Sequence, residues 1–143
     1  MTERLVCDAS TVVAMLLDAG SEGQWATRQL VGPDLAAPTL MAYEAANIIR
    51  RQESAGLISQ DQAGQAHADL LDLAIEQWPY ETVAARAWQL RRNLSIYDAG
   101  YVALAELLET RLVTLDRRIG RAPGPQCAIA TPEDTRPVPA DPA

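Results

Sequence analysis

Residues 95–116 constrain the fold of this 143-residue chain more than any other stretch. The first part follows a capping serine with apolar residues at helical spacing, so it predicts a helix. The second part, 111–115, is short, apolar and partly β-branched, so it predicts a strand that ends at Asp116. If that strand joins a parallel sheet, the helix must carry the chain back to the strand's start. Asp98 and Asp116 would then share the carboxyl edge of the sheet, where open α/β sheets bind their ligands.

Strands and helices alternate along the rest of the chain. Further strands are predicted at 4–8, 34–37, 75–78 and 127–130. Further helices are predicted at 11–17, 21–31, 39–55, 59–74 and 81–94, with a short turn at 117–121. This alternation predicts an α/β fold with a parallel sheet. Because the connections 39–74 and 81–109 each hold two helices, simple strand–helix–strand winding does not say how these pairs fold back.

Composition favours one globular domain in an aqueous, reducing compartment. Hydrophobic residues make up 48% of the chain, which is enough for a core, so we expect a domain at 1–131 and a disordered, Pro-rich tail at 132–143. Cys7 and Cys127 both lie in short apolar runs and are expected to be buried free thiols. Two cysteines and one histidine cannot form a four-ligand zinc site. The chain shows neither a membrane-length apolar run nor a signal-peptide pattern, so we expect a soluble, cytoplasmic protein.

Four carboxylates are the candidate chemical groups. Asp8 ends a predicted strand, and Glu44 lies in the second turn of the helix that leaves the next strand, so both could join Asp98 and Asp116 at one edge. Each also has a purely structural interpretation: Asp8 and Asp116 as helix caps, Asp98 in a capping box and Glu44 as a solvated helix residue. Four adjacent carboxylates would repel one another unless a cation held them. Hard oxygen ligands of this kind select Mg²⁺ or Mn²⁺.

Four segments that carry these acids resemble the acidic motifs of the PIN-domain nucleases. The segments are L-V-C-D-A-S, P-T-L-M-A-Y-E, Y-D-A-G-Y-V-A-L-A-E and L-V-T-L-D. The small size is similar to that of the VapC toxins of bacterial toxin–antitoxin pairs, and the resemblance covers residues 4 to about 131. The family's acidic positions fall on Asp8, Glu44, Asp98 and Asp116, and none is missing. Ser10 and Thr114 match positions that often carry small polar or hydroxyl side chains in this family.

The resemblance implies a three-layer α/β/α sandwich with a central parallel sheet. It also implies endoribonuclease activity with one or two Mg²⁺ ions, or Mn²⁺, held by Asp8, Asp98 and Asp116. Glu44 would bind a second ion or act through water, and a metal-activated water would cleave the phosphodiester. The implied partners are an RNA substrate, a cognate VapB-like antitoxin and a second copy of the chain in a homodimer, with no membrane association.

The net charge of −7 argues against passive, non-specific binding to nucleic acid. Removing the four site carboxylates changes that charge to −3, and bound cations would neutralise them. All twelve basic residues are arginines. Arg117, Arg118 and Arg121 directly follow a proposed metal ligand, so we expect them to contact substrate phosphates. The alternative is a solvated arginine face.

Other functions remain open from the residues alone. Receiver and haloacid-dehalogenase phosphotransfer domains also gather aspartates at a sheet edge, but they use a lysine, and this chain has none. A metal-dependent adhesion module needs D-x-S-x-S, and position 12 is Val. A PIN-type nuclease that acts on DNA or in RNA processing is the main enzymatic alternative. A PIN-like module that only binds a partner is the non-catalytic one, which the intact acidic set argues against.

Overall fold

The computed structural model describes residues 2–132, and the prediction of a disordered tail falls almost wholly outside them. Five strands form one sheet in the order β3-β2-β1-β4-β5, and every neighbouring pair is parallel. The strands are β1 (Arg4–Cys7), β2 (Asp34–Pro38), β3 (Ile75–Trp78), β4 (Leu112–Val113) and β5 (Ile129–Ala130). The predicted α/β class and parallel sheet are therefore confirmed.

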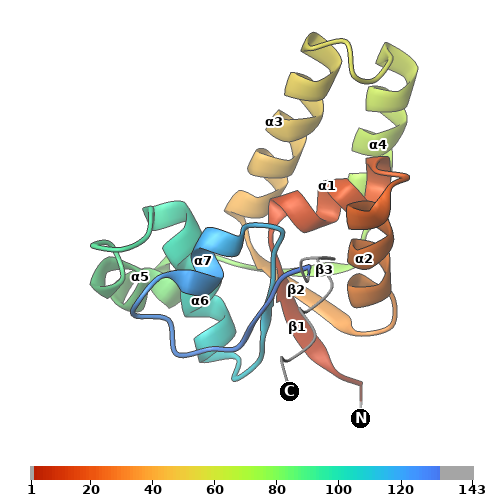
Figure 1. The fold of residues 1–143 in the computed structure, drawn as a ribbon. Coiled ribbons are helices and arrows are strands. Elements are labelled where there is room, and N and C mark those ends of the chain that lie inside the picture. The colour runs from red at the N-terminus through yellow and green to blue at the C-terminus, as the bar shows by residue number, and fades with distance from the viewer. Residues whose placement is uncertain (1, 133–143) are drawn as a thin grey trace, which may run out of the picture.

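Helices cover both faces of this sheet (Figure 1). They are α1 (Ala9–Leu17), α2 (Ser21–Leu30), α3 (Leu40–Ser54), α4 (Gln60–Asp72), α5 (Tyr80–Gln89), α6 (Ile96–Leu107) and α7 (Arg117–Arg121). Helices α1 to α4 pack together on one side, with α3 and α4 rising as an antiparallel pair. Helix α6 packs against β1, β2 and β4 from the other side, and α5 lies against α6. The predicted three-layer sandwich is confirmed, and the pairing of α3 with α4 shows how the first two-helix connection folds back.

The unit at 95–116 folds as its sequence predicts. The Ser95 hydroxyl accepts the backbone N–H of Asp98 at 3.1 Å and caps α6, whose central residues are almost all buried. The chain then returns through β4, which pairs in parallel with β1 in the register Val6↔Leu112 and Cys7↔Val113. Asp8 and Asp116 follow these two neighbouring strands, so both lie at the carboxyl edge of the sheet.

Two local predictions were wrong. The helix predicted at 81–94 ends at Gln89, because the N–H of Leu90 bonds to the carbonyls of both Arg86 and Ala87 and tightens the last turn. The chain then turns before the Ser95 hydroxyl caps the next helix. The turn predicted at 117–121 is the short helix α7, because Asp116 caps it by accepting the N–H of Arg118.

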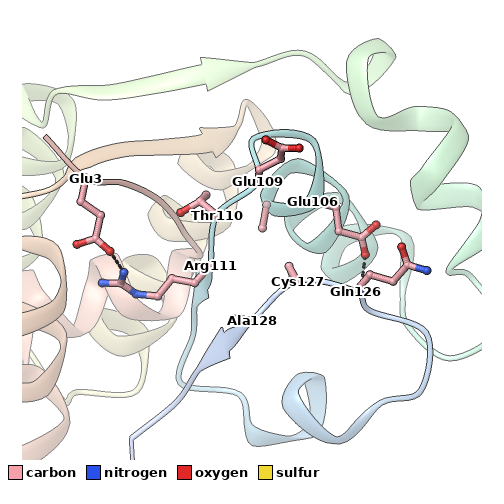
Figure 2. A pocket seen from close by; sticks show the side chains of 9 residues that line it. Glu3, Glu106, Glu109, Thr110, Arg111, Gln126, Cys127 and Ala128 are labelled. Atoms are coloured by element: carbon pink, nitrogen blue, oxygen red, sulfur yellow. Dashed lines mark hydrogen bonds and ion pairs between the residues drawn. The ribbon is translucent and has the colours of Figure 1, made fainter. Parts of the chain in front are cut away.

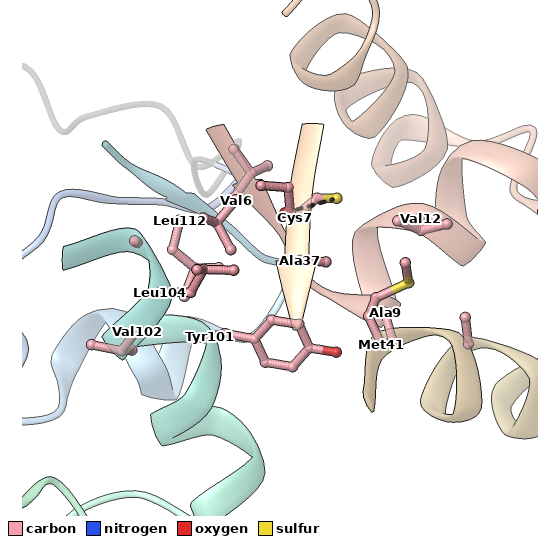
Figure 3. Close-up of a cluster of buried hydrophobic side chains, with 14 of the residues drawn as sticks. Val6, Cys7, Ala9, Val12, Ala37, Met41, Tyr101, Val102, Leu104 and Leu112 are labelled. Atoms are coloured by element: carbon pink, nitrogen blue, oxygen red, sulfur yellow. Dashed lines mark hydrogen bonds between the residues drawn. The ribbon is translucent and has the colours of Figure 1, made fainter. Parts of the chain in front are cut away.

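The core joins the sheet to helices from both sides (Figure 3). Val6, Leu104 and Leu112 are fully buried between β1, α6 and β4. Cys7 is also fully buried as a free thiol, and its burial, with the nearby charge of Asp8, raises its pKa to about 12. Cys127 is free but only partly buried, so the expectation of two buried thiols holds fully for Cys7 alone. Within 2–132, no helix combines the length and apolar character that crossing a membrane requires.

Candidate active site

Asp8 is held by hydroxyl groups from two parts of the chain. Its Oδ1 accepts the hydroxyls of Ser10 at 2.8 Å and Thr11 at 2.7 Å, and the backbone N–H of Thr11 at 3.0 Å. Its Oδ2 accepts the Thr114 hydroxyl at 2.5 Å, across the β1–β4 boundary. Only 7% of Asp8 is exposed, so these four donors replace the hydration that the buried carboxylate has lost. The carboxylate is therefore fixed in position before any ligand binds.

Thr114 links Asp8 to Asp116. Its hydroxyl donates to Asp8 and accepts the backbone N–H of Asp116 at 3.0 Å. Thr114 is fully buried, which makes this link part of the core rather than a surface contact. The hydroxyl that the sequence placed two residues before the last acid therefore aligns the ends of two strands.

Arg118 occupies the carboxylate of Asp116. Its Nε donates to Oδ1 at 3.1 Å, and its Nη2 donates to Oδ2 at 3.0 Å. This fork-to-fork pairing lowers the pKa of the Asp116 carboxyl below its usual value. Asp116 is partly buried, whereas 87% of the Arg118 side chain is exposed. Both oxygens of one candidate ligand are thus already engaged by a cation from the same chain.

Glu44 lies on α3 and receives a hydrogen bond from α6. The Tyr101 hydroxyl donates to Glu44 Oε1 at 2.7 Å, and Tyr101 itself is 2% exposed. Burial raises the pKa of the Glu44 carboxyl, the Tyr101 bond lowers it, and the charges of Asp98 and Asp8 raise it further. The pKa of Tyr101 is raised far above its ordinary value, first by burial and then by its bond to Glu44. Tyr101 therefore remains a donor at all physiological pH values.

Asp98 is half-buried in the first turn of α6. Burial raises the pKa of its carboxyl, and the Ser95 hydroxyl opposes that rise. The charges of Asp116 and Asp8 raise the same pKa, and the charge of Arg118 lowers it. Each of Glu44 and Asp98 thus feels the charge of Asp8, and Asp98 also feels that of Asp116. The structure brings all four predicted acids to one edge of the sheet.

The donors of this edge suit a hard divalent cation in kind, because they are carboxylate and hydroxyl oxygens. Their spacing, however, does not match a metal-binding cluster. Among residues 2–132, no three His, Cys, Asp or Glu side chains lie close enough together to hold a metal ion. Asp116 is bound to Arg118, and Glu44 to Tyr101. The carboxylates therefore form an acidic edge, and their side chains would have to move closer together to coordinate a cation.

The structural interpretations of these acids are also correct in part. Asp8 caps α1 and Asp116 caps α7, each by accepting a backbone N–H. Capping uses only some of the lone pairs of a carboxylate, so it does not prevent a second role. Because both acids follow strands and begin helices, the same position serves the fold and faces the edge of the sheet.

The three arginines predicted to contact phosphate lie in different environments. Arg118 contacts Asp116, as described above. Arg117 lines a hollow of about 770 Å³ with Trp25 and Arg28 of α2. Arg121 is exposed in the last turn of α7. The structure therefore places one of the three, Arg118, directly on a candidate ligand.

Two residues of the site were missed in the sequence, Thr11 and Tyr101. Tyr101 lies three residues after Asp98, so both share one face of α6, and a hydroxyl on an apolar face was the available signal. Thr11 lies three residues after Asp8, where a cap partner is expected. The sequence alone indicated two ordinary helix residues. Thr11 binds the cap residue Asp8, and the partner of Tyr101, Glu44, lies on a different helix.

A second hollow, of about 630 Å³, lies at the opposite edge of the sheet (Figure 2). Glu3 precedes β1 and forms an ion pair with Arg111, which precedes β4. Glu106 of α6 pairs with Arg86 at 2.6 Å and accepts the backbone N–H of Gln126 at 2.9 Å. Glu3 and Glu106 are therefore already paired within the chain. None of the four acids of the acidic edge lines this hollow.

Comparisons with known proteins agree with this geometry. Residues 5–125 match the PIN domain family. Ribonuclease VapC9 of Mycobacterium tuberculosis is 36% identical over 126 residues, which cover 87% of this chain and 95% of the relative. The crystal structure of PAE2754 from Pyrobaculum aerophilum is similar with a TM-score of 0.60 and 26% identity, covering 90% of this chain and 83% of that one. VapBC2 from Rickettsia felis, solved bound to a promoter DNA fragment, has a TM-score of 0.63 at 12% identity, over 90% of this chain and 98% of that one, which shows a common fold alone.

Two parallel strands end in acids, a third acid lies at a helix start and a fourth lies on α3. Together with the named relatives, the fold defines a ribonuclease class of protein. The family match covers most of the chain, so this chain belongs to the PIN-domain family. Its resemblance to the VapC ribonucleases is confirmed.

Proposed function

We propose that this chain is a Mg²⁺-dependent endoribonuclease and the toxin of a toxin–antitoxin pair. The observation that carries the proposal is the acidic edge, at which the charges of Asp8 and Asp98 raise the pKa of Glu44 and those of Asp8 and Asp116 raise the pKa of Asp98. Relatives that cover most of the chain are named ribonucleases, which favours RNA over DNA and an enzyme over a binding module. The domain is proposed to span residues 1–131.

The proposed ligands of Mg²⁺, or of Mn²⁺, are Asp8, Asp98 and Asp116, with Glu44 nearby. One or two ions would supply water activation and charge neutralisation for hydrolysis of a phosphodiester. The chain's own hydroxyls would keep the ligands in place: Thr11 and Thr114 hold Asp8, and Tyr101 holds Glu44. Because all four of these acids are partly or fully buried, their charges act in a less polar medium than water and attract a cation more strongly.

Arg117, Arg118 and Arg121 are the proposed contacts to RNA phosphates. They belong to the short helix α7, which Asp116 caps, so they stand beside the proposed cleavage site. Contacts of this kind position the substrate and carry no sequence information. The RNA sequence that is cut is therefore set by other residues.

A small, basic antitoxin is the proposed inhibitor. An acidic edge in a chain of net charge −7 attracts arginine, and the guanidinium fork already found on Asp116 shows that a carboxylate of this edge can accept one. An antitoxin segment that carries Arg would compete with Mg²⁺ and with RNA. Calorimetric titration of the co-encoded small protein should show weaker binding to Asp8→Asn/Asp116→Asn than to wild type, and weaker binding in Mg²⁺. Equal affinity in all samples would contradict inhibition at this edge.

A homodimer is the proposed assembly. A mostly apolar hollow of about 330 Å³ lies between α3, α5 and α6 and is lined by residues that include Leu40, Tyr43, Tyr80 and Tyr97. Tyr43 is 80% exposed and Tyr97 55% exposed. Large apolar side chains gathered on one face favour association with another protein surface.

The test of the proposed activity uses purified protein, free of antitoxin, with total RNA and with single-stranded DNA. RNA should be cut in Mg²⁺, left intact in EDTA and cut again when Mg²⁺ is restored in excess. Equal cleavage with and without EDTA would contradict the metal mechanism. Preferential cleavage of DNA would favour the alternative PIN activity, and no cleavage of either substrate in Mg²⁺ or Mn²⁺ would favour the binding module.

A further inference from the structure

Arg118 has two possible partners that exclude each other, the carboxylate of Asp116 and the phosphate of a substrate. In this structure its guanidinium engages both oxygens of Asp116 through Nε and Nη2, at 3.1 and 3.0 Å. A fork that uses both oxygens leaves the carboxylate no comparable geometry for a second cation. Arg118 and a divalent ion therefore compete for one ligand.

The ion pair between Arg118 and Asp116 can be broken at little cost in stability. The Arg118 side chain is 87% exposed, and exposed pairs add little to stability because water and salt screen them. The other contact of Asp116 with this residue, the bond from the Arg118 backbone N–H at 2.9 Å, caps α7 and does not depend on the side chain. Release of the guanidinium therefore leaves the helix cap in place.

The neighbouring arginines do not share this position. Arg117 lines the hollow beside α2, and neither Arg117 nor Arg121 forms an ion pair with an acid of residues 2–132. Arg118 also lies close enough to Asp98 for its charge to influence that carboxyl. It is thus the arginine of α7 that faces the acidic edge.

We propose that Arg118 is an exchangeable positioning residue: it holds Asp116 in the metal-free protein, and on metal binding it is freed to bind an RNA phosphate. This inference rests on the proposed nuclease function. It predicts that Arg118 weakens the binding of metal alone but strengthens the binding of RNA once metal is present. Metal and RNA would then bind cooperatively. Metal on Asp116 frees Arg118 for a phosphate, and a phosphate that holds Arg118 leaves Asp116 free for the metal.

The first experiment measures metal affinity without RNA, from the EPR signal of free Mn²⁺ in titrations of the intact protein. Arg118→Gln should bind Mn²⁺ up to about fivefold more tightly than wild type, since the two-point contact of this exposed pair no longer competes. Arg121→Gln removes the same charge from the same helix and is the matched control, with an expected change of about twofold or less. Arg118→Lys keeps the charge without the fork and should lie between wild type and Arg118→Gln.

The second experiment follows the Arg118 side chain itself. In ¹⁵N-resolved NMR spectra, the Arg118 Nε–H resonance, identified by its loss in Arg118→Gln, should shift and exchange faster with water when saturating, diamagnetic Mg²⁺ is added to the metal-free protein. Binding of a cleavage-resistant phosphorothioate RNA should weaken several-fold in Arg118→Gln with Mg²⁺ and change little in EDTA, because the side chain is then on Asp116.

The outcomes separate this inference from the proposed function. Equal Mn²⁺ affinity for Arg118→Gln and Arg121→Gln would overturn the exchange and leave the metal site standing. RNA affinity that Arg118→Gln lowers equally with and without Mg²⁺ would make Arg118 an ordinary phosphate contact and also overturn the exchange. Absence of Mn²⁺ binding in every variant, wild type included, would overturn both this inference and the metal-dependent nuclease.

Discussion

The Tyr101 hydroxyl donates a 2.7 Å hydrogen bond to Glu44, which joins helix α6 on one face of the sheet to helix α3 on the other. The two residues are 57 positions apart, and Tyr101 is almost completely buried. This bond fixes a carboxylate that would otherwise be a flexible side chain at the end of three rotatable bonds. The bond therefore fixes the position of the Glu44 carboxylate relative to the other acids of the edge.

Tyr101→Phe should lower RNA cleavage and also destabilise the protein by about 1 kcal/mol, because a half-buried carboxylate loses its donor. The hydrogen bond favours ionised Glu44, so its contribution is present at neutral pH and is lost as pH falls through the titration of Glu44. Urea unfolding at neutral and acidic pH measures this difference. Tyr97→Phe, on the same helix but exposed, is the control and should change neither stability nor cleavage.

Asp98→Asn should abolish cleavage and leave the fold intact. Burial raises the folded-state pKa of Asp98, so its contribution to stability is full below the unfolded-state pKa and is lost as pH rises through the folded-state pKa. Asn does not titrate, and the variant should therefore gain stability relative to wild type at neutral pH but not in acid. Thermal unfolding across this range measures the gain. Asp61→Asn, in the exposed first turn of α4, should retain cleavage, and a folded, active Asp98→Asn would contradict the assigned role.

Cys7 should resist thiol reagents in the native protein. Its thiol is fully buried and its pKa is raised to about 12, so the reactive thiolate is scarce at neutral pH. Cys127, with a pKa of about 11 and partial exposure, should react slowly, mainly because little thiolate forms. Labelling of Cys127→Ser with a colorimetric disulfide reagent isolates Cys7. Labelling that is as fast in buffer as in denaturant would show that the β1 region is not packed as described.

Arg86 should stabilise the fold by about 1–2 kcal/mol, because it joins α5 to a mostly buried Glu106 and also donates to the carbonyl of Gly124 at 3.0 Å. Denaturant unfolding of Arg86→Leu measures this contribution. Arg91→Leu is the matched control: Arg91 lies 4.5 Å from the centre of the Trp88 ring on the exposed side of the same region, and its loss should have less than about half that effect. Equal effects would mean that the pair with Glu106 adds nothing specific.

The homodimer should depend on the apolar hollow between α3, α5 and α6. Light scattering at micromolar concentration should give a dimer mass for wild type and a monomer mass for Tyr43→Arg, because a charge in that hollow opposes its burial. Leu107→Arg changes another exposed apolar residue, 51% accessible, and should leave the dimer intact. A wild-type monomer, or a dimer unaffected by Tyr43→Arg, would contradict this interface.

The sequence predicted the strands and the acidic edge well because both follow from local rules. A strand that ends in Asp and continues into a helix specifies the location of that Asp once the sheet is parallel, and this held for Asp8 and Asp116. Ser59 also caps α4 in a capping box with Gln62, as its spacing indicates. Signals within a few residues of each other therefore located most elements and two of the four acids.

Contacts between distant segments could not be predicted in this way. The bond from Tyr101 to Glu44 depends on how α3 and α6 cross the edge of the sheet, which no local pattern describes. The fork of Arg118 on Asp116 is local, but the sequence equally allowed Arg117 or Arg121 in that place. The end of α5 at Gln89 was missed because residues up to 94 remain good helix formers, and tertiary packing with the next cap decided the boundary.

The pairing of β1 with β4 also determines when a growing chain can complete the acidic edge. Asp8 is held by Thr114, 106 residues further on, and β4 pairs with β1 in register only after Val113 has been made. An N-terminal fragment that ends before this strand lacks the Thr114 hydroxyl that binds Asp8 Oδ2, and it also lacks Asp116. During translation the acidic edge is therefore incomplete until almost the entire domain has left the ribosome. The carboxylates that we propose for cleavage are therefore brought together only near the end of the domain's synthesis.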